Sequence, residues 1–199
     1  MIAAIVLAAG KSERMGLPKM NLPWGETTVI GQVVITLVQA GVDEIVVVTG
    51  GARNKVESAL NDLPSGLPLR TVFNPHYDDG DMMLSFKAGL STLDEQVEAA
   101  LFTLGDQPQV DVGVVQSILA EFKTTHAPLI VPSYKLCRGH PWLVARPLWP
   151  ALLKLREPKT LRDFLTKYSF NIHYVLVDTD SILQDLDTPG DYQKYQRKS

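Results

Sequence analysis

The chain has 199 residues, a length that suits a single α/β domain over residues 1–199. Hydrophobic residues make up 45% of the chain and charged residues 21%, a composition that excludes global disorder and allows a sizeable core. The formal net charge of −3 argues against a general nucleic-acid-binding protein, which usually carries a basic patch.

The single cysteine, Cys137, excludes an intrachain disulfide and fits a reduced, cytoplasmic setting. The apolar run at the N-terminus is too short for a signal peptide, and no charged segment precedes it. No apolar run approaches the length of a membrane span, so we expect no membrane partner.

The first predicted element is a central parallel strand over residues 2–8, which is apolar on both faces. Small residues and then a loop with several cations follow it, up to Lys19. Small residues let backbone N–H groups approach a ligand, and Arg14 and Lys19 can complete an anion site. We therefore expect this loop to bind a phosphate chain.

Two familiar phosphate-binding motifs do not fit the loop. A P-loop that ended at Gly10-Lys11-Ser12 would need its first glycine five residues before Gly10, where the chain has Ile5. The dinucleotide fingerprint G-x-G-x-x-G fails because Ala8 stands where its first glycine is required. What remains is a longer loop in which two cations stand five residues apart.

The loop resembles the signature of the MobA-like nucleotidyltransferase family, L-A-[AG]-G-x-S-x-R-M-G-x-P-K. The matching residues are Leu7, Ala8, Ala9, Gly10, Ser12, Arg14, Met15, Gly16, Pro18 and Lys19. The resemblance implies that the nucleotide is bound by Leu7, Ala8, Ala9, Gly10, Arg14 and Lys19. It also implies that Arg14 and Lys19 take part in catalysis. With Ala9, the chain resembles the molybdenum cofactor cytidylyltransferase branch of the family, which has alanine at this position. The guanylyltransferase branch has glycine there.

The following segments alternate between helix and strand. Thr27 or Thr28 can cap the first helix, which runs to about Ala40 and is ended by Gly41. Further strands are expected at 45–48, 70–73 and 99–104, and further helices at 52–61, 82–90 and 112–122. This alternation implies an α/β fold with a doubly wound, mostly parallel, Rossmann-like sheet.

Four residues near the ends of these strands are candidate nucleotide contacts. Thr49 and Gly50 close the second strand at its carboxyl end, where open α/β sheets bind ligands. Asn74 follows the next strand, and Ser85 opens a helix in the corresponding stretch of the family. We prefer a plain loop role for the aspartates at 78, 79 and 81.

Asp106 is a candidate metal ligand, together with Asp187, and a candidate catalytic residue. It follows a buried strand, so its carboxylate faces the same crevice as the first loop. The family motif G-D-x-P matches here, and its aspartate binds Mg²⁺. The alternative, that Asp106 caps the next helix, is disfavoured because Asp111 is the better cap.

The pattern changes after residue 128, where the family has a small strand-loop-strand insertion. Strands are expected at 129–132 and 142–144. The polar loop between them matches the family's G-[NH]-P motif, which lies near the second substrate. This implies acceptor binding by Gly139, His140 and Pro141, and Arg138 can help to bind a phosphate. A histidine between glycine and proline in a polar loop is not expected in the core.

The segment 159–164 departs from the family, whose members carry a glycine-rich stretch with Asp and Arg here. This departure leaves the identity of the acceptor open. Thr160 can cap a helix over 161–165, and Arg162 either reaches an anion or is a solvated helix charge.

The last strand is expected at 172–177, and the motif D-[IL]-D-T-P follows it. Thr188, Pro189 and Asp191 form a helix start close to a capping box. In the family the second aspartate of the motif, here Asp187, lies near the metal. Strand alternation puts the side chains of Asp185 and Asp187 on the same side of the chain. The sequence alone therefore does not decide which of the two aspartates lies nearer the metal.

The resemblance implies transfer of a nucleoside monophosphate from an NTP, with CTP favoured, to a phosphorylated acceptor, with molybdopterin cofactor favoured. Mg²⁺ would be the cofactor, pyrophosphate the second product, and a molybdoenzyme a delivery partner. One alternative is a sister enzyme that uses a sugar phosphate or another alcohol phosphate. Another is a non-catalytic nucleotide-binding or cofactor-delivery module.

Overall fold

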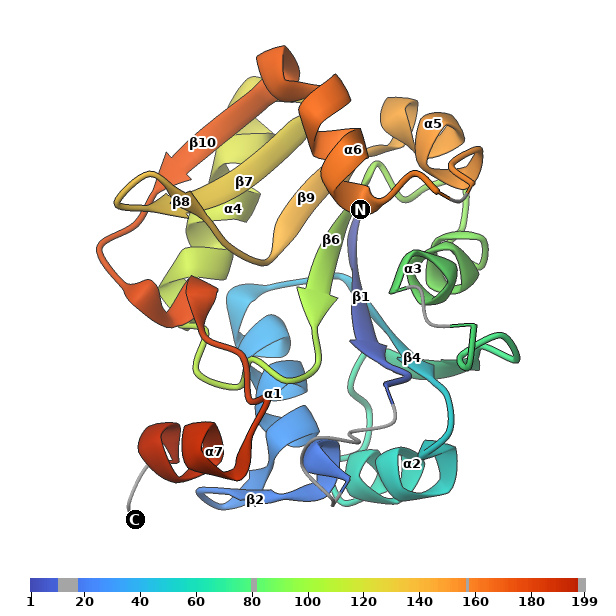
Figure 1. Cartoon of the computed structure of the whole chain (residues 1–199), viewed down its shortest axis with the longest axis vertical. Helices are drawn as coiled ribbons and strands as arrows, with labels where there is room; N and C mark the ends of the chain where they lie inside the picture. The colour runs from blue at the N-terminus through green and yellow to red at the C-terminus, as the bar shows by residue number, and fades with distance from the viewer. Residues whose placement is uncertain (11–17, 80–81, 157, 197–199) are drawn as a thin grey trace.

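In a computed structural model of the chain, the structure describes residues 1–10, 18–79, 82–156 and 158–196. Within these ranges an eight-stranded sheet forms the centre of the molecule, with helices on both of its faces (Figure 1). The strands of the sheet are β1 (Ile2–Ala8), β4 (Glu44–Thr49), β5 (Leu69–Phe73), β6 (Ala99–Leu104), β7 (Leu129–Tyr134), β8 (Cys137–Arg138), β9 (Trp142–Ala145) and β10 (Ile172–Leu176).

The helices are α1 (Val29–Ala40), α2 (Arg53–Asn61), α3 (Met82–Leu90), α4 (Val112–Thr125), α5 (Trp149–Leu153), α6 (Leu161–Lys167) and α7 (Pro189–Tyr195). Short 3-10 turns are η2 (Lys19–Asn21), η3 (Arg146–Leu148), η4 (Ser169–Asn171) and η5 (Asp180–Leu183). A separate two-stranded ladder joins β2 (Pro23–Trp24) and β3 (Thr27–Thr28). No helix within the described ranges is long and apolar enough to cross a membrane.

The sheet is mostly parallel, in the order β10-β7-β9-β6-β1-β4-β5, with β8 paired to β7. The exceptions are β9, which runs antiparallel between β6 and β7, and the short β8. From β1 the chain moves outward through β4 to β5 and then returns to β6 on the other side of β1. Such a reversal leaves a crevice at the carboxyl ends of β1 and β6, where α/β proteins bind ligands.

Strand β1 lies at the centre of two cores. Ala4 and Val6 face one cluster, which residues of α1, α2 and α4 complete. Ile5 and Leu7 face the other cluster, to which α3, α5 and α6 contribute. Because both faces are covered, the central strands are continuous apolar runs rather than alternating ones. The predicted fold class, a doubly wound and mostly parallel sheet, is confirmed.

Local signals position the first helix as expected. The Oγ1 atom of Thr28 accepts a hydrogen bond from the Gly31 N–H at 3.1 Å, which resolves the choice between Thr27 and Thr28. Gly41 ends α1 with φ 86°, a left-handed conformation that glycine adopts without a steric cost. Asp111 occupies the cap position of α4, but its side chain makes no capping hydrogen bond.

The polar stretch after β7 was expected to be a loop, and part of it is a tight hairpin. β7 continues to Tyr134, and β8 pairs back with it antiparallel. The two turn residues, Lys135 and Leu136, have φ of 47° and 68°. Two positive φ values are what a type I′ hairpin requires, and the residues that usually supply them are Asn, Asp and Gly. Their absence hid the hairpin from the sequence pattern.

Candidate functional site

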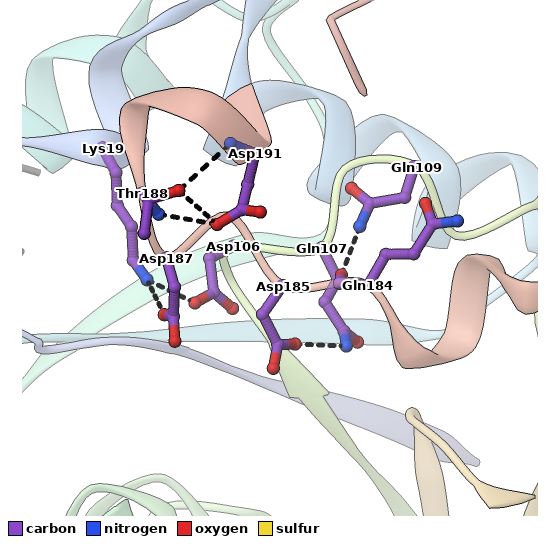
Figure 2. Close-up of polar contacts among 9 residues, drawn as sticks. All are labelled: Lys19, Asp106, Gln107, Gln109, Gln184, Asp185, Asp187, Thr188 and Asp191. Carbon is purple, nitrogen blue, oxygen red and sulfur yellow. Dashed lines mark hydrogen bonds and ion pairs between the residues drawn. The ribbon is translucent and has the colours of Figure 1, made fainter. Parts of the chain in front are cut away.

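Three residues from distant parts of the chain meet beside the carboxyl end of β6. Lys19 is the first residue of η2, Asp106 follows β6, and Asp187 lies just before α7. The Nζ atom of Lys19 lies 2.5 Å from Oδ2 of Asp106 and 3.4 Å from Oδ1 of Asp187. Figure 2 shows Lys19 directed at both carboxylates. The structure therefore gathers one cation and two carboxylates where the topology predicts a ligand crevice.

The ion pairs are partly sheltered from water. The side chains of Lys19 and Asp106 are 12% and 17% exposed, whereas Asp187 is 45% exposed. Burial by itself would lower the pKa of Lys19, but the attraction of Asp106 and then of Asp187 outweighs burial and raises this pKa above its usual value. The amine is therefore a full positive charge at neutral pH.

The position of Asp106 is set by the backbone around it. The N–H of Gly105 donates to the Leu7 carbonyl at 3.0 Å, which continues the pairing of β6 with β1. A Cβ atom on Gly105 would lie 2.7 Å from that same carbonyl oxygen, so no larger residue fits there. The next carbonyl, that of Asp106, accepts a hydrogen bond from the Leu186 N–H at 3.2 Å.

Asp187 is held by the start of α7. The Thr188 side chain accepts a bond from the Asp191 N–H at 3.2 Å, and the Asp191 carboxylate accepts one from the Thr188 N–H at 2.8 Å. This is a capping box with Pro189 at the first helical turn, as the sequence predicts. The capping box does not use the Asp187 carboxylate, which points to Lys19 instead of the helix (Figure 2).

Asp185 takes a different partner. Its Oδ1 atom accepts a hydrogen bond from Nε2 of Gln107 at 2.7 Å (Figure 2). Burial, and then repulsion by Asp106, raises the pKa of Asp185 above its usual value. A hydrogen bond from the Gln109 amide to the Gln184 carbonyl holds the same segment. Neither glutamine was predicted as part of the site, because nothing in their spacing indicates a partner so far along the chain.

The first loop is described only at its beginning. Leu7 and Ala8 end β1, Ala9 is buried, and Gly10 is exposed. The catalytic candidate Arg14 and the rest of the signature up to residue 17 lie outside the described residues.

Thr49 and Gly50 lie beside this beginning, at the end of β4. A Cβ atom on Gly50 would lie 2.5 Å from the carbonyl oxygen of Ala9. Thr49 is fully buried, and its hydroxyl donates to the Val72 carbonyl at 3.4 Å. Gly50 thus permits the close approach of two strand ends, and the Thr49 side chain bonds to the neighbouring strand.

Asn74 and Ser85 are brought together in the interior. The amide of Asn74 donates to the Ser85 hydroxyl at 3.0 Å, and its Oδ1 atom accepts the His76 N–H at 3.0 Å. They are 2% and 5% exposed, and Ser85 lies within α3 rather than at its start. The pair therefore holds the chain after β5 against α3.

The four acceptor candidates lie at the end of β8 and in its connection to β9. A Cβ atom on Gly139 would lie 2.3 Å from the Ile182 carbonyl oxygen, so this position needs glycine. The peptide bond between His140 and Pro141 is cis. Arg138 donates to the Tyr174 hydroxyl at 2.8 Å on the exposed side of β10.

The His140 ring packs on aromatic residues. Its centroid lies 4.5 Å from that of Trp142 in a stacked arrangement and 5.5 Å from that of Phe102. The residue is partly exposed, but its Nε2 atom is buried and has no hydrogen-bond partner. Burial lowers the pKa of His140 to about 4, so the ring is neutral at physiological pH. The residue is thus not part of the buried core, but its ring packs against the core residues Trp142 and Phe102.

Within the described ranges, no three His, Cys, Asp or Glu side chains are arranged to hold a metal ion. Mg²⁺ does not require such a set, because it commonly takes one or two carboxylates and completes its shell with water and phosphate oxygens. Asp106 and Asp187 already converge on one cation, the Lys19 ammonium. This donor set fits a divalent metal that arrives with a phosphate ligand.

Comparison with known proteins shows the family of the chain. A family model described as the MobA-like NTP transferase domain matches residues 4–172. The chain is 28% identical over 192 residues to the molybdenum cofactor cytidylyltransferase of Escherichia coli (strain K12), covering 96% of this chain and 93% of that protein. It is 27% identical over 195 residues to the nicotine blue oxidoreductase of Paenarthrobacter nicotinovorans, covering 94% and 92%.

Solved structures share the fold along the whole chain. The crystal structure of Rv0371c from Mycobacterium tuberculosis H37Rv has a TM-score of 0.85 and 27% identity, covering 99% of this chain and 98% of that chain. A crystal structure of Rv0371c in complex with manganese has a TM-score of 0.80 and 26% identity, with the same coverage of both chains, 99% and 98%.

Proposed function

The chain belongs to the MobA-like NTP transferase family and is a nucleotidyltransferase, and we propose that it transfers CMP from CTP to the molybdopterin cofactor. In this reaction a phosphate oxygen of the acceptor attacks the α-phosphorus, the bond from that phosphorus to the bridging oxygen breaks, and pyrophosphate leaves. The product is a cytosine dinucleotide form of the cofactor, and a molybdoenzyme is the proposed recipient.

The observation that carries the proposal is the convergence of Lys19, Asp106 and Asp187 at the carboxyl end of β6. Phosphoryl-group chemistry asks a protein mainly for positioning and charge neutralisation, and these residues offer both signs of charge. A Ser-His-Asp or Cys-His nucleophile is not needed.

We assign Asp106 and Asp187 as ligands of Mg²⁺. When bound, the metal would neutralise charge on the phosphate oxygens of the nucleotide. The ammonium of Lys19 would contact the phosphates and stabilise charge that builds on the leaving pyrophosphate. Arg14 of the signature loop would likewise contact the phosphates and stabilise the charge on the leaving pyrophosphate. The opening residues of the loop, Leu7 to Gly10, would present backbone N–H groups to the phosphates.

The remaining candidates take supporting roles in this proposal. Gly50 and Thr49 shape the wall of the nucleotide site beside Ala9, and the Asn74–Ser85 pair holds the wall formed by α3. His140, with Gly139 and Pro141, would line the acceptor side, and Arg138 would offer a cation there.

A second candidate is a nucleotidyltransferase that uses a sugar phosphate or another alcohol phosphate as acceptor. It is favoured by the segment 159–164, where Thr160 and Asp163 form a capping box that starts α6. The Asp163 carboxylate accepts a hydrogen bond from the Thr160 N–H at 2.6 Å, so it serves the helix rather than a ligand. Where the family is expected to have a glycine-rich stretch, this chain thus has the capped start of a helix.

A pyrophosphate-release screen tests the proposal. Each of the four NTPs is incubated with Mg²⁺ and either molybdopterin cofactor or a panel of sugar phosphates. We expect release with CTP and molybdopterin cofactor. Release with GTP alone would remove the cytidylyltransferase assignment, and release with a sugar phosphate alone would favour the second candidate. Nucleotide binding without release for any acceptor would identify a non-catalytic module.

A further inference from the structure

The Lys19 ammonium occupies the space between the two carboxylates assigned to the metal. Its Nζ atom lies 2.5 Å from Asp106 Oδ2 and 3.4 Å from Asp187 Oδ1, and its side chain is only 12% exposed. Figure 2 shows both carboxylates directed at this one nitrogen. Lys19 thus neutralises the same pair of negative charges that a divalent cation would neutralise.

Two cations cannot share this place. Like charges a few ångströms apart repel strongly in a sheltered site, and each carboxylate oxygen that accepts from the ammonium is less available as a metal ligand. Asp185 does not relieve the conflict, because Gln107 holds its carboxylate at 2.7 Å.

The two carboxylates and the lysine differ in how firmly they are held. Backbone bonds hold both aspartates in place: the Asp106 carbonyl accepts from the Leu186 N–H, and the capping box of Thr188 and Asp191 fixes the chain directly after Asp187. A lysine side chain, in contrast, is a point charge on a flexible four-carbon stem. When a competing cation arrives, Lys19 is therefore the group that moves.

We propose that Lys19 competes with the metal for Asp106 and Asp187, so that metal binds well only when nucleotide phosphates take over the Lys19 ammonium. Metal and nucleotide then enter as one complex, and binding of either one favours the other. This inference rests on the proposed function, which places the metal at these two carboxylates. It assigns Lys19 a second role, which is to disfavour metal binding before the nucleotide is present.

The test uses Mn²⁺ alone, without nucleotide, and measures free Mn²⁺ by electron paramagnetic resonance. Lys19→Gln and Lys19→Ala should each bind Mn²⁺ at least about tenfold more tightly than the wild type, because a competing charge has been removed. Lys19→Arg should stay as weak as the wild type. Lys55→Gln is the matched control, since it removes the same charge from an exposed position on α2.

Adding Asp106→Asn to Lys19→Gln should cancel the gain in affinity. Affinity that is unchanged or lower in both uncharged Lys19 variants would overturn the inference, and so would a gain that survives Asp106→Asn. None of these outcomes depends on turnover, so a failed inference is distinguishable from a failed function.

A measurement on the wild type covers the case in which the variants do not fold. Trace labelling with acetic anhydride, mapped by mass spectrometry, reports how accessible the Lys19 amine is. Saturating Mn²⁺ should raise the labelling of Lys19 severalfold relative to Lys55. Equal labelling of Lys19 with and without Mn²⁺ would overturn the inference.

Discussion

The backbone N–H of Leu186 donates to the carbonyl oxygen of Asp106 at 3.2 Å, which ties the segment before α7 to the end of a central strand. Because of this bond, the carboxylates on either side of it, Asp106 and Asp187, face one cation. Residues that are far apart in the chain therefore act as one charged site, and this arrangement can be tested residue by residue.

Asp106→Asn should abolish metal-dependent turnover while the protein stays folded. The change keeps the shape of the side chain and removes its charge, so the metal loses its most sheltered ligand. Asp187→Asn should be severe but less so, because water can replace one Mg²⁺ ligand at this more exposed position. Turnover as a function of Mg²⁺ concentration, with circular dichroism as the folding control, measures both. Near-native turnover in Asp106→Asn would contradict the metal assignment.

Asp185→Asn should leave kcat/KM within about a factor of five of the wild type, which corresponds to about 1 kcal/mol of transition-state stabilisation. The Asp185 carboxylate is bonded to Gln107, and an asparagine oxygen can accept the same hydrogen bond. Burial and repulsion by Asp106 raise the pKa of Asp185, so the variant should also be at least as stable at pH 7. Thermal unfolding and steady-state kinetics, compared with Asp187→Asn, decide which aspartate serves the metal. A collapse of turnover in Asp185→Asn alone would reverse the assignment.

His140 should make the protein less stable as the pH falls from about 6.5 toward about 4, the pKa of this ring in the folded chain. The unfolded chain binds more protons in this window because its histidine has the ordinary, higher pKa. The free energy of unfolding should therefore fall by about 2 to 4 kcal/mol across it.

His140→Phe is the matched variant, since phenylalanine can stack on Trp142 without titrating. Denaturant unfolding at a series of pH values should show a flatter dependence for this variant than for the wild type. Identical slopes would mean that His140 titrates normally in the folded protein. The same variant should raise the KM for the acceptor and leave the KM for the nucleotide nearly unchanged if His140 lines the acceptor side.

Asn74→Ala and Ser85→Ala should each destabilise the fold by about 1 to 3 kcal/mol, because each leaves a buried polar group without its partner. The double variant should cost less than the sum of the two single changes, since both remove the same hydrogen bond. Urea unfolding of the four proteins in this cycle gives the coupling energy. Additive effects would mean that the hydrogen bond contributes nothing measurable.

The sequence was sufficient where one local signal decides the structure. Buried apolar runs placed β1 and β6 at their observed bounds, and Thr188 with Asp191 marked the start of α7. That Asp106 lies near Lys19, which comes in the segment after β1, also follows from the α/β topology, because the carboxyl ends of parallel strands share one edge.

What could not be predicted depends on contacts between distant residues. The sequence places Lys19 in a cationic loop but does not show that its side chain is only 12% exposed and lies between two carboxylates, one of them from the segment just before α7. The bond between Gln107 and Asp185 has no signature, since amide side chains bond equally well to water. His140 was expected outside the core because it lies in a polar loop, yet its ring packs 5.5 Å, centroid to centroid, from Phe102 of the distant strand β6.

The most direct test of the account is a mass measurement on the acceptor after incubation with CTP, Mg²⁺ and molybdopterin cofactor. We predict an acceptor that has gained the mass of one CMP unit, with one pyrophosphate released per molecule of product, and no gain with Asp106→Asn. Contradiction would come from an unmodified acceptor in the wild-type reaction although CTP is bound, or from an equal gain of CMP in the wild type and in Asp106→Asn.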